Sequence, residues 1–354
     1  MEEGGTKLVA APGTPRGPKA RSADSAFFNP AMRLNRDLSM MLVDAYARGR
    51  GRPIDVADVL AGTGARALRL ARLDADLTVH ANDADPKAVQ AMHEGREANA
   101  IDPARLHIHH DDAHRFLASQ RFDVIDVDPF GSPTPFLDAA VRATRHNGLL
   151  CITATDTAAL SGTYPRVCRR RYGAEHRLKS APWSAELGLR ILAGTALRAA
   201  GRFDRAAWPV LSVWGGHWMR VILRIRDGKQ AADRCGKSLG HVSMGDGGQA
   251  IWGTGSGPAW TGPLHDAETL ASWQQVPGVD DASWRMASVM QAEASAPAFW
   301  FELGALRRHF NVDAPKREVL MQRLRDAGYV AAPTHMDPQG IRTDADLNAI
   351  RAVW

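Results

Sequence analysis

Between about residues 54 and 225 the sequence alternates short apolar runs with longer amphipathic segments, and this alternation restricts the fold more than any other feature. The runs have strand length and few polar side chains, as is typical of strands buried on both faces of a parallel sheet. The segments between them include residues 85–99, with Pro86 at an expected helix start, and residues 135–145. The runs themselves are residues 54–60, 78–82, 106–110, 122–128 and 149–155. The pattern predicts a repeated βα unit.

Two later apolar runs, residues 210–214 and 218–225, are separated only by Gly215, Gly216 and His217. So short a connection predicts an antiparallel hairpin that closes the sheet. Together with the parallel strands, this hairpin gives the seven-stranded sheet of Rossmann-like methyltransferases. We therefore predict an α/β fold of that class.

Length and composition indicate a globular protein of about two domains. Of the 354 residues 45% are hydrophobic and 23% are charged, and no apolar run reaches the roughly 18 residues that a membrane span needs. After Ile225 the sequence becomes Gly-rich and polar, which indicates a domain boundary near residues 227–235. We predict a mobile basic arm at 1–25, a methyltransferase domain at 26–228 and a C-terminal domain at 229–354.

The net charge and the cysteines bear on the kind of partner and on the cellular compartment. Lys and Arg number 44 against 39 Asp and Glu, and the net charge of +5 suits an anionic partner without identifying one. Cys151, Cys168 and Cys235 are too few and too scattered for a disulfide framework, and the N-terminus lacks a secretory signal. We therefore expect a reducing compartment, the cytoplasm.

A glycine loop follows the first predicted strand. Gly62 and Gly64 allow the backbone to approach a ligand, and the start of the next helix offers unpaired amides. Asp83 ends the second predicted strand, at the spacing where an acidic side chain accepts hydrogen bonds from ribose hydroxyls. S-adenosylmethionine and a dinucleotide both present such a ribose. The loop also fits a nicotinamide or flavin fingerprint, or a purely structural turn.

Asp112 and Ala113 follow the third predicted strand. In sheets of this kind an acidic acceptor at this point faces an adenine amine. The alternative is that Asp112 caps the following helix, and taken alone this alternative is favoured.

The segment Asp128-Pro129-Phe130-Gly131 ends the fourth predicted strand and has the most specific chemistry in the chain. The Asp128 carboxylate and the Pro129 carbonyl can accept hydrogen bonds from both hydrogens of an exocyclic amine on a nucleobase. Phe130 can stack on the plane of that base. The alternative is that the prolines and the glycine only shape a loop.

Several motifs resemble the tRNA guanine-26 dimethyltransferase family, in order from about residue 27 to residue 346. In the first domain they are residues 27–30, 35–37, 62–66, 82–83, 128–133, 136–138, 155–156 and 169–173. In the second domain they are residues 257–266 and 334–344.

The resemblance implies transfer of one or two methyl groups from S-adenosylmethionine to the exocyclic 2-amino group of guanosine 26 in tRNA. By this resemblance Asp128, with the Pro129 carbonyl, is catalytic, and Phe27 and Phe130 sandwich the guanine. The cofactor-contacting positions are Arg36, Gly62, Gly64, Arg66, Asp83, Asp112 and Ala113. Without the resemblance, Phe27 would be expected in a core and Arg36 in a surface ion pair.

The chain also departs from the family pattern. The family often carries a four-cysteine zinc site in its second domain, whereas here only Cys235 remains, and Cys235 with His241 is not a ligand set. We therefore expect no metal. The family's His-Glu pair is reduced to Glu186, because Ala185 stands where the His is expected.

Basic residues crowd the segment from Arg166 to Lys179, which contains one acid, Glu175. A run of this kind is either a solvated face or a track for phosphates, and its place after the predicted sheet favours the second. The candidate tRNA-binding residues are Arg166, Arg169, Arg170 and Arg171. The helical segments at 295–306 and 316–326 are expected to form a winged-helix-like part of an α+β tRNA-binding domain, by fold analogy.

The sequence thus predicts a cytoplasmic tRNA methyltransferase that uses S-adenosylmethionine, with tRNA as partner and with no membrane or obligate protein partner. Transfer is expected to be direct, because no cysteine lies in a nucleophile motif. Two alternatives remain: a nicotinamide-dependent oxidoreductase and a non-catalytic tRNA-binding protein.

Overall fold

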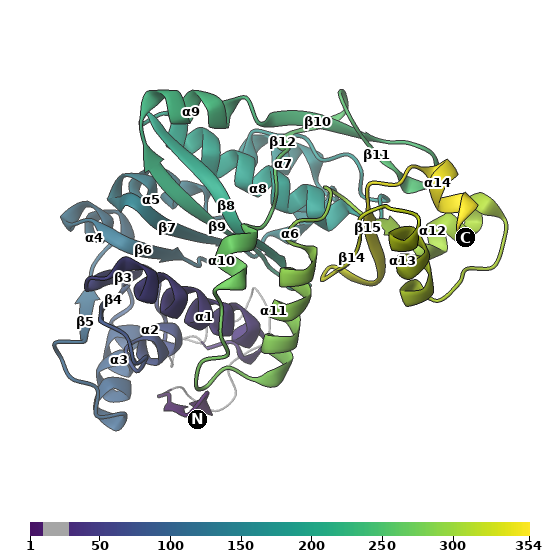
Figure 1. The fold of residues 1–354 in the computed structure, drawn as a ribbon. Coiled ribbons are helices and arrows are strands. Elements are labelled where there is room, and N and C mark those ends of the chain that lie inside the picture. Colours follow the sequence, from purple (N-terminus) through teal and green to yellow (C-terminus); the bar gives the residue numbers. More distant parts are fainter. Residues whose placement is uncertain (10–27) are drawn as a thin grey trace.

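The structure, a computed structural model, describes residues 1–9 and 28–354 and centres on a seven-stranded sheet with the order β5-β4-β3-β6-β7-β9-β8 (Figure 1). The pairs from β5 through β7 are parallel, whereas β9 is antiparallel to both β7 and β8. The strands are β3 Ile54–Asp58, β4 Leu77–Asp83, β5 Leu106–His110, β6 Phe122–Val127, β7 Thr144–Ala154, β8 Arg205–Trp214 and β9 Met219–Asp227. The predicted Rossmann-like fold with its closing hairpin is confirmed.

Helices cover both faces of this sheet. In β7, Leu149 and Cys151 point into one core while Leu150 and Ile152 point into the other, as the alternation of side chains along a strand requires. The first face carries α1 Arg33–Arg50, α2 Ala65–Leu70, α3 Pro86–Ala98, α10 Ala267–Ala271 and α11 Asp281–Glu293. The second carries α4 Ala113–Ser119, α5 Leu137–Ala143, α8 Ser184–Gly201 and α9 Lys229–Gly236. Figure 1 shows α1, α2 and α3 below the sheet and α8 and α9 above it.

The first nine residues form a small hairpin, β1 Glu2–Glu3 and β2 Thr6–Lys7. The turn needs glycine, because a Cβ at Gly4 would lie 2.5 Å from the Gly278 carbonyl oxygen. Leu8 joins the core under α1. Residues 1–9 therefore differ from the predicted mobile arm, since a buried leucine and a tight turn fix them. The rest of that arm, and Phe27, lie outside the described residues.

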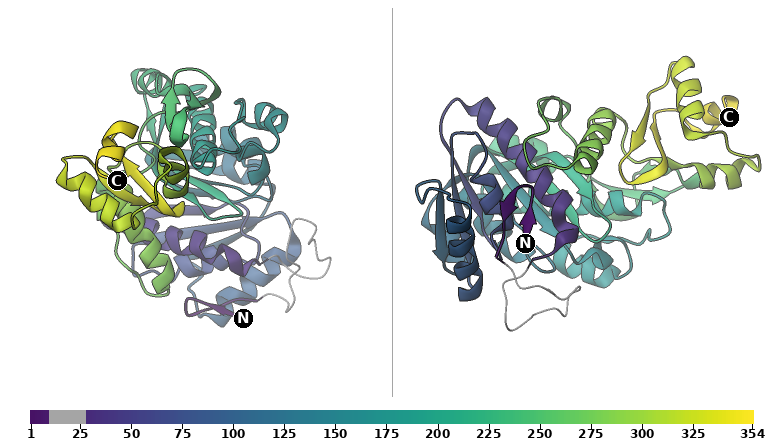
Figure 2. Two further views of the ribbon diagram at one scale, coloured as in Figure 1. Left: turned by 90° about the vertical axis from the view of Figure 1, so that its right-hand side faces the viewer. Right: turned by 90° about the horizontal axis from the view of Figure 1, so that it is seen from below.

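The C-terminal part adds two small sheets. One has the order β11-β10-β12, with β10 Leu239–Met244, β11 Ala250–Trp252 and β12 Ser256–Trp260. The other has the order β13-β15-β14, with β13 Phe301–Glu302, β14 Ala331–Thr334 and β15 Asp337–Thr343. The second sheet packs with α12 Leu303–Phe310, α13 Arg317–Asp326 and α14 Leu347–Ala352 around a core of its own. Two helices followed by a hairpin give this unit winged-helix character, and Figure 2 shows it projecting from the body of the molecule.

One predicted helix is largely wrong. Residues 295–302 contain no helix, because Phe301 and Glu302 pair with β15 as the short strand β13, and α12 starts only at Leu303. The helix predicted at 316–326 is present as α13. The boundary at 228/229 stays a prediction; Val242, Trp260 and Phe299 pack in the same core as the sheet, and a separate core starts at Phe301.

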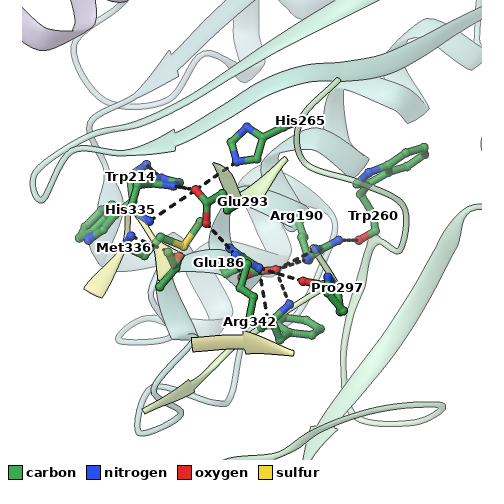
Figure 3. A network of polar contacts seen from close by, with 12 residues as sticks. Glu186, Arg190, Trp214, Trp260, His265, Glu293, Pro297, His335, Met336 and Arg342 are labelled. Carbon is green, nitrogen blue, oxygen red and sulfur yellow. Dashed lines mark hydrogen bonds and ion pairs between the residues drawn. The ribbon is translucent and has the colours of Figure 1, made fainter. Parts of the chain in front are cut away.

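A buried cluster of charges joins the winged-helix unit to the rest of the molecule (Figure 3). Arg342 of β15 binds Glu293 of α11 through Nε at 2.7 Å and Glu186 of α8 through Nη2 at 2.8 Å. Arg190 also binds Glu186, with Nη2 2.7 Å from Oε1. Glu186 is fully buried and belongs to this cluster. Two carboxylates and two guanidiniums therefore balance within it.

His335 extends the cluster to the central sheet. Its Nδ1 contacts Glu293 Oε1, while its Nε2 accepts a hydrogen bond of 3.2 Å from the backbone N–H of Trp214, at the end of β8. Burial alone raises the pKa of Glu293, but His335 and Arg342 outweigh this and hold it well below its usual value. The stabilisation from Glu293 is therefore present at neutral pH and is lost only as the pH falls through that lowered pKa.

Replacement of Arg342 by Leu is expected to lower the free energy of unfolding by about 3–5 kcal/mol, because it leaves two buried carboxylates without their shared partner. Urea unfolding followed by tryptophan fluorescence measures this. The control is Arg308→Leu, because the Arg308 side chain is 72% exposed and lies 3.5 Å from Glu302. A loss of under about 1 kcal/mol is expected there. Equal losses in the two variants would contradict a clamp at Arg342.

Candidate active site

The carboxyl ends of the parallel strands lie along one edge of the sheet, where ligands bind in open α/β folds. Because β8 pairs antiparallel with β9, and β9 with β7, Trp214 at the end of β8 lies on this same edge. His335 contacts Trp214, so the winged-helix unit docks at the edge that carries the predicted site.

The glycine loop after β3 is held by Asp83. The Gly62 amide donates to Asp83 Oδ2 at 2.8 Å, and the Asp85 amide donates to Oδ1 at 3.0 Å. Gly64 has φ +73°, and a Cβ there would lie 2.6 Å from Met92 Cγ. The loop therefore requires glycine. A carboxylate oxygen has two lone pairs, so Asp83 keeps acceptor capacity for a ribose while it orders the loop.

Arg66, in the first turn of α2, bridges the carboxylates of Asp126 in β6 and of Asp128 directly after β6. Its Nη2 lies 2.5 Å from Asp128 Oδ2, and its Nη1 donates to Asp126 Oδ2. Only 6% of Arg66 is exposed. A predicted cofactor-contacting residue and the predicted catalytic carboxylate are therefore in direct contact.

Sequence reasoning missed the residues behind this bridge. Arg220 of β9 is fully buried and binds Asp126 on its far side, with Nη1 3.1 Å from Oδ1. Arg220 also donates to Ser39 Oγ and to Thr153 Oγ1, both at 2.9 Å. The available signal was an arginine inside the apolar run 218–225, where a buried charge needs a partner.

The neighbouring carboxyls have pKa values shifted in opposite directions. Burial raises the pKa of Asp128, and Arg66 only partly opposes the rise. Burial acts on Asp126 too, but Arg220 and Arg66 together outweigh it and hold the pKa of Asp126 below its usual value. Burial also raises the pKa of Asp58, at the end of β3, to about 7. Asp126 is thus a permanent anion and Asp128 a better proton acceptor than an exposed aspartate.

The catalytic loop presents its groups outward. Phe130 is 64% exposed. Gly131, at φ +84°, is fixed to the next strand end, because its amide donates to Thr155 Oγ1 at 2.6 Å and its carbonyl accepts from the Thr155 amide at 2.8 Å. In the described part of the chain, no group donates a hydrogen bond to the Pro129 carbonyl. That oxygen and the Asp128 carboxylate can serve as a pair of acceptors.

Arg36 of α1 is buried beside the first residues of the chain. Its guanidinium lies 4.9 Å from the centre of the Phe28 ring, and its Nη2 donates to the Asn29 carbonyl at 3.1 Å. Its charge acts to lower the pKa of Asp128, against the larger effect of burial. Phe27, the predicted partner of Phe130, lies outside the described residues.

Asp112 caps α4, which is the alternative that the sequence left open. Its Oδ1 accepts from the amides of His114 at 2.9 Å and Arg115 at 3.3 Å. These backbone hydrogen bonds lower its pKa. Ala113 is the first residue of α4 and is buried. A cap of this kind leaves Oδ2 available, so the predicted contact with an adenine stays a prediction.

Four arginines of the basic run lie exposed on α7 Pro165–Tyr172, and these are the predicted tRNA-binding residues Arg166, Arg169, Arg170 and Arg171. Arg171 pairs with Asp156 at 2.8 Å, and Arg169 pairs with Glu175. Arg166 and Arg170 have no ion pair with any described residue. The four arginines of α7 therefore divide into two that pair with nearby acids and two that have no acidic partner among the described residues.

Within the described residues, one group of side chains has metal-ligand types: His265, Glu293 and His335. His335 Nε2 accepts the Trp214 amide, so in the neutral ring the proton lies on Nδ1, which faces Glu293. A metal would need that nitrogen bare. Arg342 also neutralises Glu293 already. The hydrogen bonds thus favour an ion-paired cluster over a metal centre.

Comparison with known proteins agrees with this arrangement. A profile of the family described as N2,N2-dimethylguanosine tRNA methyltransferase matches residues 8–247 and 253–354. A tRNA (guanine(26)-N(2))-dimethyltransferase of Methanothermobacter thermautotrophicus is 33% identical over 363 residues, covering 95% of this chain and 94% of the relative. One from Pyrobaculum islandicum is 36% identical over 337 residues, covering 92% and 91%.

A solved structure of similar fold is that of Trm1 from Pyrococcus horikoshii in complex with S-adenosyl-L-methionine. It aligns with a TM-score of 0.87 and 29% identity, covering 100% of this chain and 98% of that one. The match spans the central sheet and the winged-helix unit alike. The chain belongs to the N2,N2-dimethylguanosine tRNA methyltransferase family.

Proposed function

We propose that this protein transfers one or two methyl groups from S-adenosylmethionine to the 2-amino group of guanosine 26 in tRNA, in the cytoplasm. The observation that carries the proposal is the loop after β6, where the half-buried Asp128 has a raised pKa and lies beside the exposed ring of Phe130 and the Pro129 carbonyl, which accepts no hydrogen bond from a described residue. Membership of the family supports the same reaction.

The cofactor-contacting residues proposed are Arg36, Gly62, Gly64, Arg66, Asp83, Asp112 and Ala113. The ordered glycine loop and the Asp83 carboxylate beside it have the chemistry that a ribose requires. When bound, the cofactor supplies an electrophilic methyl group on a sulfonium. Arg36 is a buried charge in α1, and Asp112 is an exposed charge at the start of α4.

Asp128 and the Pro129 carbonyl would accept hydrogen bonds from the two hydrogens of the guanine amine. Such an amine is a weak nucleophile, because its lone pair is delocalised into the ring. When the nitrogen takes the methyl group it becomes positively charged, and Asp128 stabilises that charge and accepts the departing proton. The raised pKa of Asp128 favours this proton transfer. Phe130, with Phe27, would hold the base by stacking.

Direct transfer fits the cysteines. Burial raises the pKa of Cys151 and of Cys168 to about 12 and that of Cys235 to about 11. Thiols with such pKa values are protonated at neutral pH and are poor nucleophiles. No covalent intermediate with the protein is therefore proposed.

In the part of the chain that the structure describes, no helix is long and apolar enough to span a membrane.

Asp83→Ala is expected to weaken S-adenosylmethionine binding by about 1.5–3 kcal/mol for each charged hydrogen bond removed. Part of the lost binding free energy arises because the glycine loop is no longer held by the hydrogen bond from the Gly62 amide to Asp83. Calorimetric titration of the variant measures it. The exposed helix cap Asp85, replaced by Ala, is the control and should leave the affinity near that of the unmodified protein. Unchanged affinity in Asp83→Ala would remove this residue from the site.

Asp128→Asn keeps the shape of the side chain but removes the proton acceptor, so single-turnover methyl transfer should fall about a hundredfold or more while tRNA binding persists. In the unmodified protein the rate should fall as the pH is lowered, with a midpoint above the ordinary aspartate pKa of 3.8, because the protonated carboxyl cannot accept the proton. A near-normal rate in the variant would exclude this mechanism.

Replacement of both Arg166 and Arg170 by Ala is expected to weaken tRNA binding and to reduce its salt dependence. The slope should fall by roughly 0.7 to 0.9 for each phosphate that the protein no longer binds. Binding isotherms at several salt concentrations give the slope. Arg121→Ala is the matched control, because Arg121 is exposed at the opposite edge of the sheet, before β6. Equal slopes for the double variant and the control would show that the arginines of α7 do not bind phosphates and form only a solvated face.

A further inference from the structure

The hairpin at the start of the chain places one carboxylate in a buried group of charges. Glu3 is 6% exposed, whereas its neighbour Glu2 is exposed. The Glu3 carboxylate accepts from Arg36 Nε at 2.7 Å and from Arg36 Nη2 at 2.5 Å, a two-point contact, and from Arg69 Nη1 at 2.6 Å. Burial alone would raise the pKa of Glu3, but the two arginines hold it below its usual value. Glu3 is therefore an anion at neutral pH.

The second acid of the group has a different partner. Asp37 binds Arg69 through Oδ1, and its Oδ2 lies 3.6 Å from Arg33. Arg69 is 1% exposed and also donates to the Gly278 carbonyl. Asp37 thus serves the packing of α1 against α2 and the loop before α11. Of the two buried acids, Glu3 is the one that contacts Arg36.

Arg36 stands between this group and the active site. One side of its guanidinium is fixed by Glu3, and the same side chain contacts Asn29 and the Phe28 ring, next to the segment that carries Phe27. Without Glu3, the hydrogen bonds of the Arg36 guanidinium to described residues are reduced to the one with the Asn29 carbonyl, and the guanidinium can rotate about that bond. A two-point ion pair removes this freedom, because it fixes both the position and the plane of the guanidinium.

We propose that Glu3 is a positioning residue, which holds Arg36 in the orientation that binds the cofactor, so that the first hairpin of the chain completes the active site. This inference rests on the proposed function, in which Arg36 contacts S-adenosylmethionine. It assigns to residues 1–9 a role in cofactor binding in addition to packing.

The test is a double-mutant cycle on Glu3 and Arg36, read by calorimetric binding of S-adenosylmethionine to the full chain. Glu3→Gln keeps the shape but removes the charge, and it should raise the dissociation constant about tenfold. In the Arg36→Ala background the same substitution should change nothing further, because the residue through which Glu3 acts is gone. In steady state, Glu3→Gln should raise KM for the cofactor and leave KM for tRNA unchanged.

Two controls separate positioning from stability. Glu2→Gln alters the exposed neighbour and should leave the affinity unchanged. Asp37→Asn removes the other buried acid; it should lower the melting temperature without the tenfold loss of affinity. If Glu3→Gln does not fold, Glu3→Asp is measured in its place, since it keeps the charge but draws the carboxylate back from the Arg36 guanidinium by one methylene group.

The proposal is overturned if Glu3→Gln binds the cofactor normally, or if it weakens binding equally with and without Arg36. Failure of the proposed function is a separate outcome. In that case the unmodified protein would neither bind S-adenosylmethionine nor methylate tRNA, and this is measured before any variant. If the unmodified protein binds the cofactor and methylates tRNA, but the effects of the Glu3 and Arg36 substitutions on binding are additive, only the role of Glu3 is overturned.

Discussion

One buried arginine connects the two halves of the active site. Arg66 is in the first turn of α2, directly after the glycine loop. Its guanidinium binds both Asp126 and Asp128 at the end of β6. The loop that would hold a cofactor and the loop that would hold a base follow the paired strands β3 and β6, and this side chain adds a direct link between them. Burial makes the contact strict, because an unpaired charge at this depth is expensive.

The sharing of positive charge between two carboxylates sets their chemistry. Asp126 is paired with two arginines, Arg66 and Arg220, and its pKa is lowered. Asp128 shares Arg66 with Asp126, and its pKa is raised. Arg220 comes from the antiparallel strand β9, so the closing hairpin is part of the site as well as of the sheet. The fold and the acid–base behaviour of the catalytic loop therefore depend on the same contacts.

Local patterns in the sequence were sufficient for the strands and for the loops at their ends. Apolar runs located β3 to β9, and the Asp128 motif lies directly after β6, at the strand end where it was predicted. Partners far apart in the chain were not predictable in this way. Arg220 lies 94 residues from Asp126, and Arg36 lies 33 residues from Glu3, so only the folded chain brings each pair together. The helix expected at 295–306 is present only from Leu303, because Phe301 and Glu302 pair with β15 and this strand pairing outweighs local helical periodicity.

Two buried charge clusters hold peripheral parts of the chain against the central domain. One joins the first hairpin to α1 and α2 through Glu3, and the other joins the winged-helix unit to α8 and α11 through Arg342. Apolar packing alone would tolerate small rotations at either contact, because it has no direction. Ion pairs and hydrogen bonds have fixed geometry and lose their stabilisation when the groups rotate. A site that must hold a cofactor, a base and an RNA backbone together gains its alignment from such directional contacts, which explains why charges lie where hydrophobic side chains would cost less to bury.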